Sequence, residues 1–184
     1  MTDNTSAVEA VAELAQEGAF RVAAAESLTC GQVAADLGAG PQASQWFRGG
    51  VVAYASEVKF DVLGVTPGPV VTATCAREMA HGAARLLGAD AVVATTGVGG
   101  PDPEEDEPPG TVFLAAVVRG REACSRLDLD GTPEDVLRAT RAHALQLLGD
   151  TMRAAMERDV NAPQQPGTER AEGPADSRTP AASR

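Results

Sequence analysis

Short apolar runs alternate with longer amphipathic stretches along most of the chain. The apolar runs have the length of strands, and we expect strands at 19–25, 49–55, 91–95, 111–118 and 122–129. Between them, apolar residues recur at helical spacing, which predicts helices at 5–18, 32–37, 57–63, 73–87 and 133–158. Strands that alternate with helices predict an α/β fold on a layered sheet, and the final hairpin makes that sheet mixed.

The last part of the chain has a different composition. From residue 159 onward it holds almost no apolar residues and many Pro, Gly, Ala and charged residues, which is typical of disorder. The chain of 184 residues suits one ordinary domain with a proper core. We therefore expect an α/β domain over residues 1–158 and a disordered polar tail over residues 159–184.

The composition argues against several classes of function. A net charge of −11 disfavours a general nucleic-acid or anionic-membrane surface, although a small anionic ligand needs only a local nest of N–H groups. The aromatic content of 3% disfavours recognition of single strands by stacking. The N-terminus does not resemble a signal peptide, no run approaches a membrane span, and the three cysteines are widely separated. We expect a cytoplasmic protein with reduced thiols.

The stretch RVAAAESLTCG, residues 21–31, is the most informative local feature. An apolar strand ends there in a turn, and the chain then continues as a helix. A hydroxyl at such a turn, Ser27 above all, is expected near the backbone N–H groups of the helix start, which suits a nucleophile whose oxyanion needs donors. The alternative is that Ser27 or Thr29 is only the N-cap of the helix.

Two further loops are expected at the same edge of the sheet, because ligands in such sheets bind beyond the carboxyl ends of the strands. One holds Tyr54 and Lys59, and a serine with a lysine and a tyrosine is a known alternative to the Ser-His-Asp set. The other, 96–101, is rich in glycine, which lets backbone N–H groups approach an anion. The alternatives are a solvated lysine and a simple glycine turn.

Metal chemistry is not indicated by the sequence. His81 and His143 fall inside predicted helices, and neither has a second ligand at metal-binding spacing. The acidic segment 102–109 could attract a divalent cation weakly, but its composition is more typical of a solvated loop. We expect neither a metal nor a cofactor.

Four segments resemble, in order and spacing, the motifs of the CinA C-terminal domain family in its stand-alone form, a nicotinamide-nucleotide amidohydrolase. They are AESLTCG at 25–31, GGVVAYASEVK at 49–59, TGVGGP at 96–101 and PPGTV at 108–112. The resemblance covers about residues 5–155. It implies a three-layer α/β/α sandwich with a mixed, mostly parallel central sheet.

The resemblance also implies hydrolysis of nicotinamide mononucleotide to nicotinic acid mononucleotide and ammonia, a step of pyridine-nucleotide salvage. By position it makes Ser27 the nucleophile, Lys59 its base and Tyr54 a supporting residue, with the amides after Ser27 holding the oxyanion. The substrate-binding residues that it implies are Glu26, Thr29, Cys30, Gly31, Thr96, Gly97, Gly99 and Gly100. No metal is needed for this acyl transfer.

The chain departs from the family pattern at several positions, among them Ser56, the segment 102–104, Cys30 and Pro133. Cys30 stands within the glycine element after the nucleophile, and Pro133 stands where relatives carry an arginine suited to the substrate. Arg138 or Arg141, in the predicted last helix, could replace that arginine. These departures leave a second hypothesis open, a nucleotide-binding or scaffold protein of the same fold without activity. An alanine-rich sheet domain with few aromatic residues is also expected to form a homo-oligomer.

Overall fold

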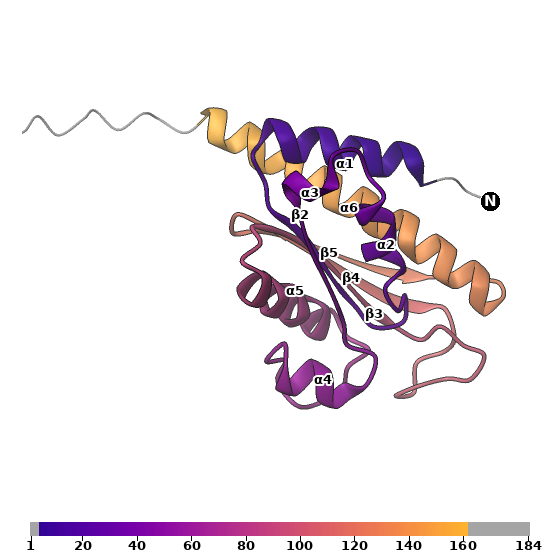
Figure 1. The fold of residues 1–184 in the computed structure, drawn as a ribbon. Helices are drawn as coiled ribbons and strands as arrows, with labels where there is room; N and C mark the ends of the chain where they lie inside the picture. The colour runs from indigo at the N-terminus through magenta and orange to yellow at the C-terminus, as the bar shows by residue number, and fades with distance from the viewer. Residues whose placement is uncertain (1–3, 162–184) are drawn as a thin grey trace, which may run out of the picture.

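Five strands form one sheet in the structure, a computed structural model that describes residues 4–161 (Figure 1). They are β1 (Val22–Glu26), β2 (Phe47–Val52), β3 (Ala91–Gly97), β4 (Thr111–Val118) and β5 (Arg121–Asp128). Their spatial order is β2-β1-β3-β4-β5. β1 is parallel to β2 and β3, whereas β4 is antiparallel to β3 and β5, so the sheet is mixed, as predicted.

Helices cover both faces of this sheet. They are α1 (Thr5–Glu17), α2 (Gln32–Gly38), α3 (Ala43–Trp46), α4 (Ser56–Asp61), α5 (Ala73–Leu87) and α6 (Pro133–Asn161). α1, α2, α3 and α6 pack on one face, whereas α5 and the segment around α4 pack on the other (Figure 1). The predicted three-layer α/β/α sandwich is therefore confirmed.

The alternation of side chains along β1 shows how one strand serves both layers. Val22 and Ala24 belong to the core cluster that α1 and α6 complete, while Ala23 and Ala25 belong to the cluster under α5. All five residues of β1 are buried, because helices cover the strand on both sides. This double cover explains why the strand is apolar from Val22 to Ala25 in the sequence.

The first strand starts later than the sequence predicted. β1 begins at Val22 rather than at residue 19, because Ala19 has a left-handed backbone with φ 49°. The amide of Arg21 then donates to the carboxylate of Asp90 at 2.7 Å instead of to a neighbouring strand. The first three positions of the predicted strand, 19–21, are therefore a turn residue and two irregular residues.

Other boundaries shift by a few residues. β2 covers 47–52 rather than 49–55, and α4 covers 56–61 rather than 57–63. The last helix continues to Asn161, past its predicted end, and the remainder of the predicted tail, 162–184, lies outside the described residues. None of the helices in the described part is long and apolar enough to cross a membrane.

The register of the sheet brings the ends of β1 and β2 to one level, and β3 continues for two residues beyond it. Glu26, the last residue of β1, pairs with Val52 of β2 and with Thr95 of β3. The next residue, Ser27, donates its backbone N–H to the Thr95 carbonyl at 2.9 Å, and Ala53 donates to the Glu26 carbonyl at 2.7 Å. The loops after β1, β2 and β3 therefore start at the same edge of the sheet.

Candidate active site

A pocket of about 220 Å³ opens where these loops meet, and we call it the Ser27 pocket. It is lined by Ser27, Leu28, Tyr54, Val70, Val71, Thr96, Gly97, Val98, Gly99, Gly100, Asp102, Glu104, Pro133 and Leu137. Its walls come from the turn after β1, the loop after β3, the segment before α5 and the start of α6. Parts of the chain that are far apart in sequence thus form the Ser27 pocket at the edge of the sheet.

Ser27 is fixed by its backbone, and its hydroxyl is left unbonded. The residue is 8% exposed, its N–H donates to Thr95, and its carbonyl accepts the N–H of Cys30 at 3.1 Å. Within residues 4–161, Ser27 Oγ has no hydrogen-bond partner. A rigid turn therefore supplies the pocket with a hydroxyl that is available to a substrate.

The helix start behind Ser27 is occupied by Glu26. The Glu26 carboxylate is buried and accepts the N–H groups of Gly31 and Val33 at Oε2, both at 3.0 Å, and that of Ala34 at Oε1, at 2.7 Å. A carboxylate is stabilised there by the free N–H groups and by the helix dipole. The prediction that the N–H groups of this helix start are free for an oxyanion is wrong, because Glu26 takes three of them.

Neither Ser27 nor Thr29 is the N-cap of α2. The N-cap is Gly31, whose φ of 89° lies in the left-handed region that favours glycine. Thr29 is fully buried, and its hydroxyl shares a hydrogen bond with Thr95 Oγ1 at 2.8 Å. In the part of the chain that the structure describes, the amides of Leu28 and Thr29 have no hydrogen-bond partner. They are the N–H groups next to Ser27 that remain available.

Lys59, on α4, is buried rather than solvated. The residue is 1% exposed, and its Nζ donates to the backbone carbonyl of Tyr54 at 3.1 Å. Burial lowers the pKa of the amine from its ordinary value of 10.5, and the nearby Cys75, Glu104 and Glu105 partly oppose that shift. A buried amine of this kind can lose its proton at a lower pH than an exposed lysine and then act as a base.

The connection between Lys59 and the Ser27 pocket runs through Tyr54. Lys59 does not line the pocket, and no hydrogen bond joins it to Ser27 within residues 4–161. Tyr54, which is 70% exposed, does line the pocket, and its carbonyl holds the amine of Lys59. The structure therefore places the amine directly behind a residue of the pocket wall.

Cys75 lies behind the same wall. Burial raises the pKa of the Cys75 thiol to about 11, although the charge of Lys59 acts in the opposite direction. The hydroxyl of Thr96, also buried, donates to the carbonyl of Val70 at 2.8 Å. The thiol is therefore neutral at physiological pH, and Thr96 fixes the segment before α5 to the end of β3.

The glycine loop after β3 needs its glycines for two separate reasons. Gly97 and Gly100 have φ values of 153° and 88°, which other residues rarely adopt. A Cβ at Gly97 would also lie 2.4 Å from the carbonyl oxygen of Thr111. In the described residues the amides of Gly99 and Gly100 have no hydrogen-bond partner. The loop thus packs tightly against β4 and keeps two N–H groups available.

The structure brings together only some of the residues that the sequence indicated. Those that line the Ser27 pocket are Ser27, Tyr54, Thr96, Gly97, Gly99 and Gly100. Those that do not line it are Glu26, Thr29, Cys30, Gly31 and Lys59. Asp102 and Glu104 also line the pocket; the sequence marked them as a departure from the family pattern but assigned them no place in the site, because an acidic segment rich in proline is typical of a solvated loop. In residues 4–161, no group of three or more His, Cys, Asp or Glu side chains could hold a metal ion.

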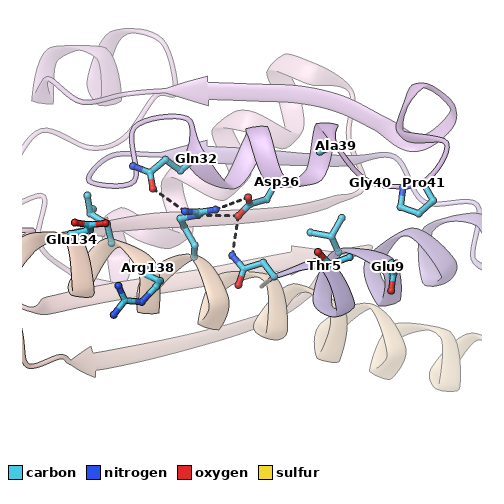
Figure 2. A pocket seen from close by; sticks show the side chains of 13 residues that line it. Thr5, Glu9, Gln32, Asp36, Ala39, Gly40, Pro41, Glu134 and Arg138 are labelled. Atoms are coloured by element: carbon cyan, nitrogen blue, oxygen red, sulfur yellow. Dashed lines mark hydrogen bonds and ion pairs between the residues drawn. The ribbon is translucent and has the colours of Figure 1, made fainter. Parts of the chain in front are cut away.

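Neither of the two arginines proposed to replace the family arginine lines the Ser27 pocket. Both line a second, larger cavity of about 1250 Å³ between α1, α2 and α6 (Figure 2). Arg141 forms two hydrogen bonds with the carboxylate of Asp36, at 2.9 and 2.6 Å, and a third with Gln32 at 3.3 Å. Arg138 forms an ion pair with Asp135. Both guanidinium groups are therefore occupied by other partners.

Comparison with known proteins connects this geometry to a family. The family model described as the CinA C-terminal domain matches residues 4–152. A putative competence-damage inducible protein of Geobacillus kaustophilus is 44% identical over 131 residues, which are 67% of this chain and 31% of the relative. The corresponding protein of Bacillus subtilis is 36% identical over 135 residues, or 71% of this chain and 32% of the relative. The chain thus spans about a third of the length of these curated relatives.

Solved structures agree with this result. A competence-damaged protein (CinA) superfamily protein of Klebsiella pneumoniae aligns with a TM-score of 0.79 and 31% identity, over 83% of this chain and 99% of its own. A member of the same superfamily from Escherichia coli aligns with a TM-score of 0.77 and 30% identity, over 79% of this chain and 88% of its own. The family model and the solved structures agree, and the chain belongs to the CinA C-terminal domain family.

Proposed function

We propose that this chain is an amidohydrolase that converts nicotinamide mononucleotide to nicotinic acid mononucleotide and ammonia. The observation that carries the proposal is the unbonded hydroxyl of Ser27 in a pocket whose wall residue Tyr54 holds the buried amine of Lys59. An unbonded hydroxyl in a pocket whose wall residue holds a buried amine of lowered pKa suits nucleophilic catalysis. The family resemblance indicates that the bond to be cleaved is the C–N bond of the carboxamide.

The proposed reaction proceeds through an ester on Ser27. The hydroxyl oxygen attacks the carboxamide carbon while the neutral amine of Lys59 takes the hydroxyl proton. The amides of Leu28 and Thr29 donate to the oxyanion of the tetrahedral intermediate. The C–N bond then breaks, and Lys59 returns its proton to the departing nitrogen, which leaves as ammonia. Water, deprotonated by Lys59, hydrolyses the ester and restores the Ser27 hydroxyl.

One rearrangement is required for this sequence of steps. Lys59 Nζ donates to the carbonyl of Tyr54, so the amine must turn from Tyr54 toward Ser27 or act through one bridging water. Catalytic hydrogen bonds are often long or poorly aligned before the substrate binds. A substrate amide next to Tyr54 would bring the three groups together.

The size of the Ser27 pocket limits which part of the substrate it encloses. Pockets for small ligands have volumes of about 300–1000 Å³. The Ser27 pocket, at about 220 Å³, is smaller than this range. We therefore expect the pyridine ring and its carboxamide to enter the pocket, and the ribose and phosphate to remain at the rim.

The test is ammonia release from nicotinamide mononucleotide by the purified protein, with nicotinic acid mononucleotide identified as the second product. The Ser27→Ala variant is the blank, since it removes only the hydroxyl. We expect wild-type release at neutral to mildly alkaline pH that exceeds the blank by about a thousandfold or more. Equal release by the two proteins, or no release by either, would refute the proposal.

A second candidate is a pocket that binds a pyridine nucleotide without turning it over. The observation that favours it is the hydrogen bond of Lys59 to the Tyr54 carbonyl, with none to Ser27 in residues 4–161. Titration calorimetry separates the two candidates. Binding of the mononucleotide without ammonia release supports the second candidate, whereas release that depends on Ser27 supports the first.

A further inference from the structure

We propose that Glu105 is a positioning residue for the Ser27 pocket: its carboxylate holds the backbone of Val70 and Val71 and so fixes the wall against which the substrate ring packs. The inference rests on the proposed function, which supplies the substrate that this wall would hold. Val70 and Val71 both line the pocket, and each is 4% exposed. They belong to the irregular segment before α5, so no helix or strand holds their backbone.

The hydrogen bonds of Glu105 take the place of the missing secondary structure. Its Oε2 accepts the N–H groups of Val70 and Val71, both at 2.8 Å, and its Oε1 lies 2.9 Å from the same Val70 nitrogen. Within residues 4–161 these two N–H groups have no other acceptor. On the opposite side, the carbonyl of Val70 accepts the hydroxyl of Thr96 at 2.8 Å. The wall is therefore held from two sides, and a charged acceptor makes the stronger bonds on one of them.

The turn that carries Glu105 is itself tied to the sheet. Glu104 and Glu107 exchange two backbone hydrogen bonds across this turn, at 3.1 and 2.9 Å. The carboxylate of Glu107 forms an ion pair with Arg126 of β5 at 2.9 Å. Glu105 has a left-handed backbone with φ 50°, a conformation that residues other than glycine rarely adopt. The turn thus holds the Glu105 carboxylate against the pocket wall from a fixed position.

The same carboxylate acts on the amine that serves as the base in the proposed reaction. Burial lowers the pKa of Lys59, and four groups oppose that shift: Cys75 of α5, Glu104 and Glu105 of the turn, and Glu57 of α4. A negative charge near the amine favours its protonated form. Removal of the Glu105 charge should therefore lower the pKa of Lys59 further, an effect that a purely structural contact would not produce.

Glu78 offers a matched control at the other end of the same segment. Its carboxylate accepts the backbone N–H and the hydroxyl of Thr66, at 2.8 and 3.1 Å. The contact is of the same kind, but neither Glu78 nor Thr66 lines the Ser27 pocket. Glu78 is also not among the groups that act on Lys59. If Glu105 only stabilised the fold, alanine at the two positions would have the same effect on the reaction.

The first experiment measures ammonia release from nicotinamide mononucleotide. We expect KM to rise about tenfold in Glu105→Ala and to stay within about twofold in Glu78→Ala, because only the first substitution releases the wall. Glu105→Gln keeps one oxygen for the two N–H groups but loses the charge. In that variant KM should rise less, and the pH at which kcat reaches half its maximum should fall. Equal KM values for the two alanine variants would overturn the inference.

Binding to proteins without the nucleophile keeps this test separate from that of the reaction. In the Ser27→Ala background, calorimetry should show about tenfold weaker binding of nicotinamide mononucleotide after Glu105→Ala, and affinity within about twofold after Glu78→Ala. That result, without ammonia release by the wild type, would retain the inference and refute the proposed reaction. Equal affinities of the two double variants, or no binding by the Ser27→Ala protein, would overturn the inference.

Discussion

The Glu26→Gln substitution tests how the turn that carries Ser27 is held. The Glu26 carboxylate accepts two N–H groups at one oxygen, those of Gly31 and Val33, and that of Ala34 at the other. A glutamine amide has only one oxygen. If that oxygen keeps the first two bonds, the glutamine NH₂ group faces the N–H of Ala34, a donor against a donor.

The cost of this change follows from two contributions. A buried donor without an acceptor costs about 1–3 kcal/mol. Loss of the negative charge at the start of α2 adds about 0.5–2 kcal/mol, because the residue is buried and the helix dipole is poorly screened. We therefore expect the free energy of unfolding to fall by about 2–4 kcal/mol, with unequal contributions that do not simply add.

Urea unfolding of the purified proteins measures this loss directly. Glu9→Gln makes the same substitution on the exposed surface of α1, and it should change stability by less than about 0.5 kcal/mol. The turn at Ser27 should also loosen in Glu26→Gln, so that kcat falls more than KM rises. A Glu26→Gln protein as stable as the Glu9→Gln control would refute the reasoning.

Three further predictions concern the wall behind and beside Ser27. Lys59→Met should abolish ammonia release. Burial lowers the folded-state pKa of Lys59 below 10.5, so the unfolded chain binds the proton more tightly, and the stability of the wild type relative to Lys59→Met should rise as pH increases through the folded-state pKa toward 10.5. A stability difference in urea unfolding that does not change with pH would contradict this. Iodoacetamide at pH 8 should label Cys30 and Cys124 in the native protein but Cys75 only after unfolding, since Cys75 is buried with a pKa of about 11. Peptide mass spectrometry identifies the labelled cysteines, and rapid labelling of Cys75 in the native protein would count against this prediction. Gly97→Ala should lower the free energy of unfolding by about 1–3 kcal/mol or more. Gly99→Ala, whose Cβ would meet nothing closer than 3.9 Å, should change that free energy by less than about 0.5 kcal/mol. Equal thermal unfolding of the two variants would argue against a strained Gly97.

The fold was predictable because the apolar pattern depends on burial, which the sequence records. β1 and β3 are covered on both faces and each begins with a run of four apolar residues, whereas the β5 edge strand mostly alternates between partly buried and exposed residues. Strand ends were less predictable. Ala19 and Phe20 are apolar like the strand that follows, but a left-handed backbone at Ala19 places both of them before it.

Part of the candidate site followed from the rule that parallel strands present their carboxyl ends at one edge. That rule located Ser27, Tyr54 and the glycine loop, all of which line one pocket. The role of Glu26 was not predictable, because its contacts five to eight residues away depend on the shape of the turn. The burial of Lys59 was not predictable either, because a lysine after a strand is usually solvated.

The central claim, that Ser27 is the nucleophile, is tested most directly by trapping the ester. Wild-type protein mixed with saturating nicotinamide mononucleotide and quenched in acid should yield a Ser27 peptide heavier by the acyl group, and the Ser27→Ala variant should yield none. Ammonia release by Ser27→Ala at the wild-type rate would contradict the account.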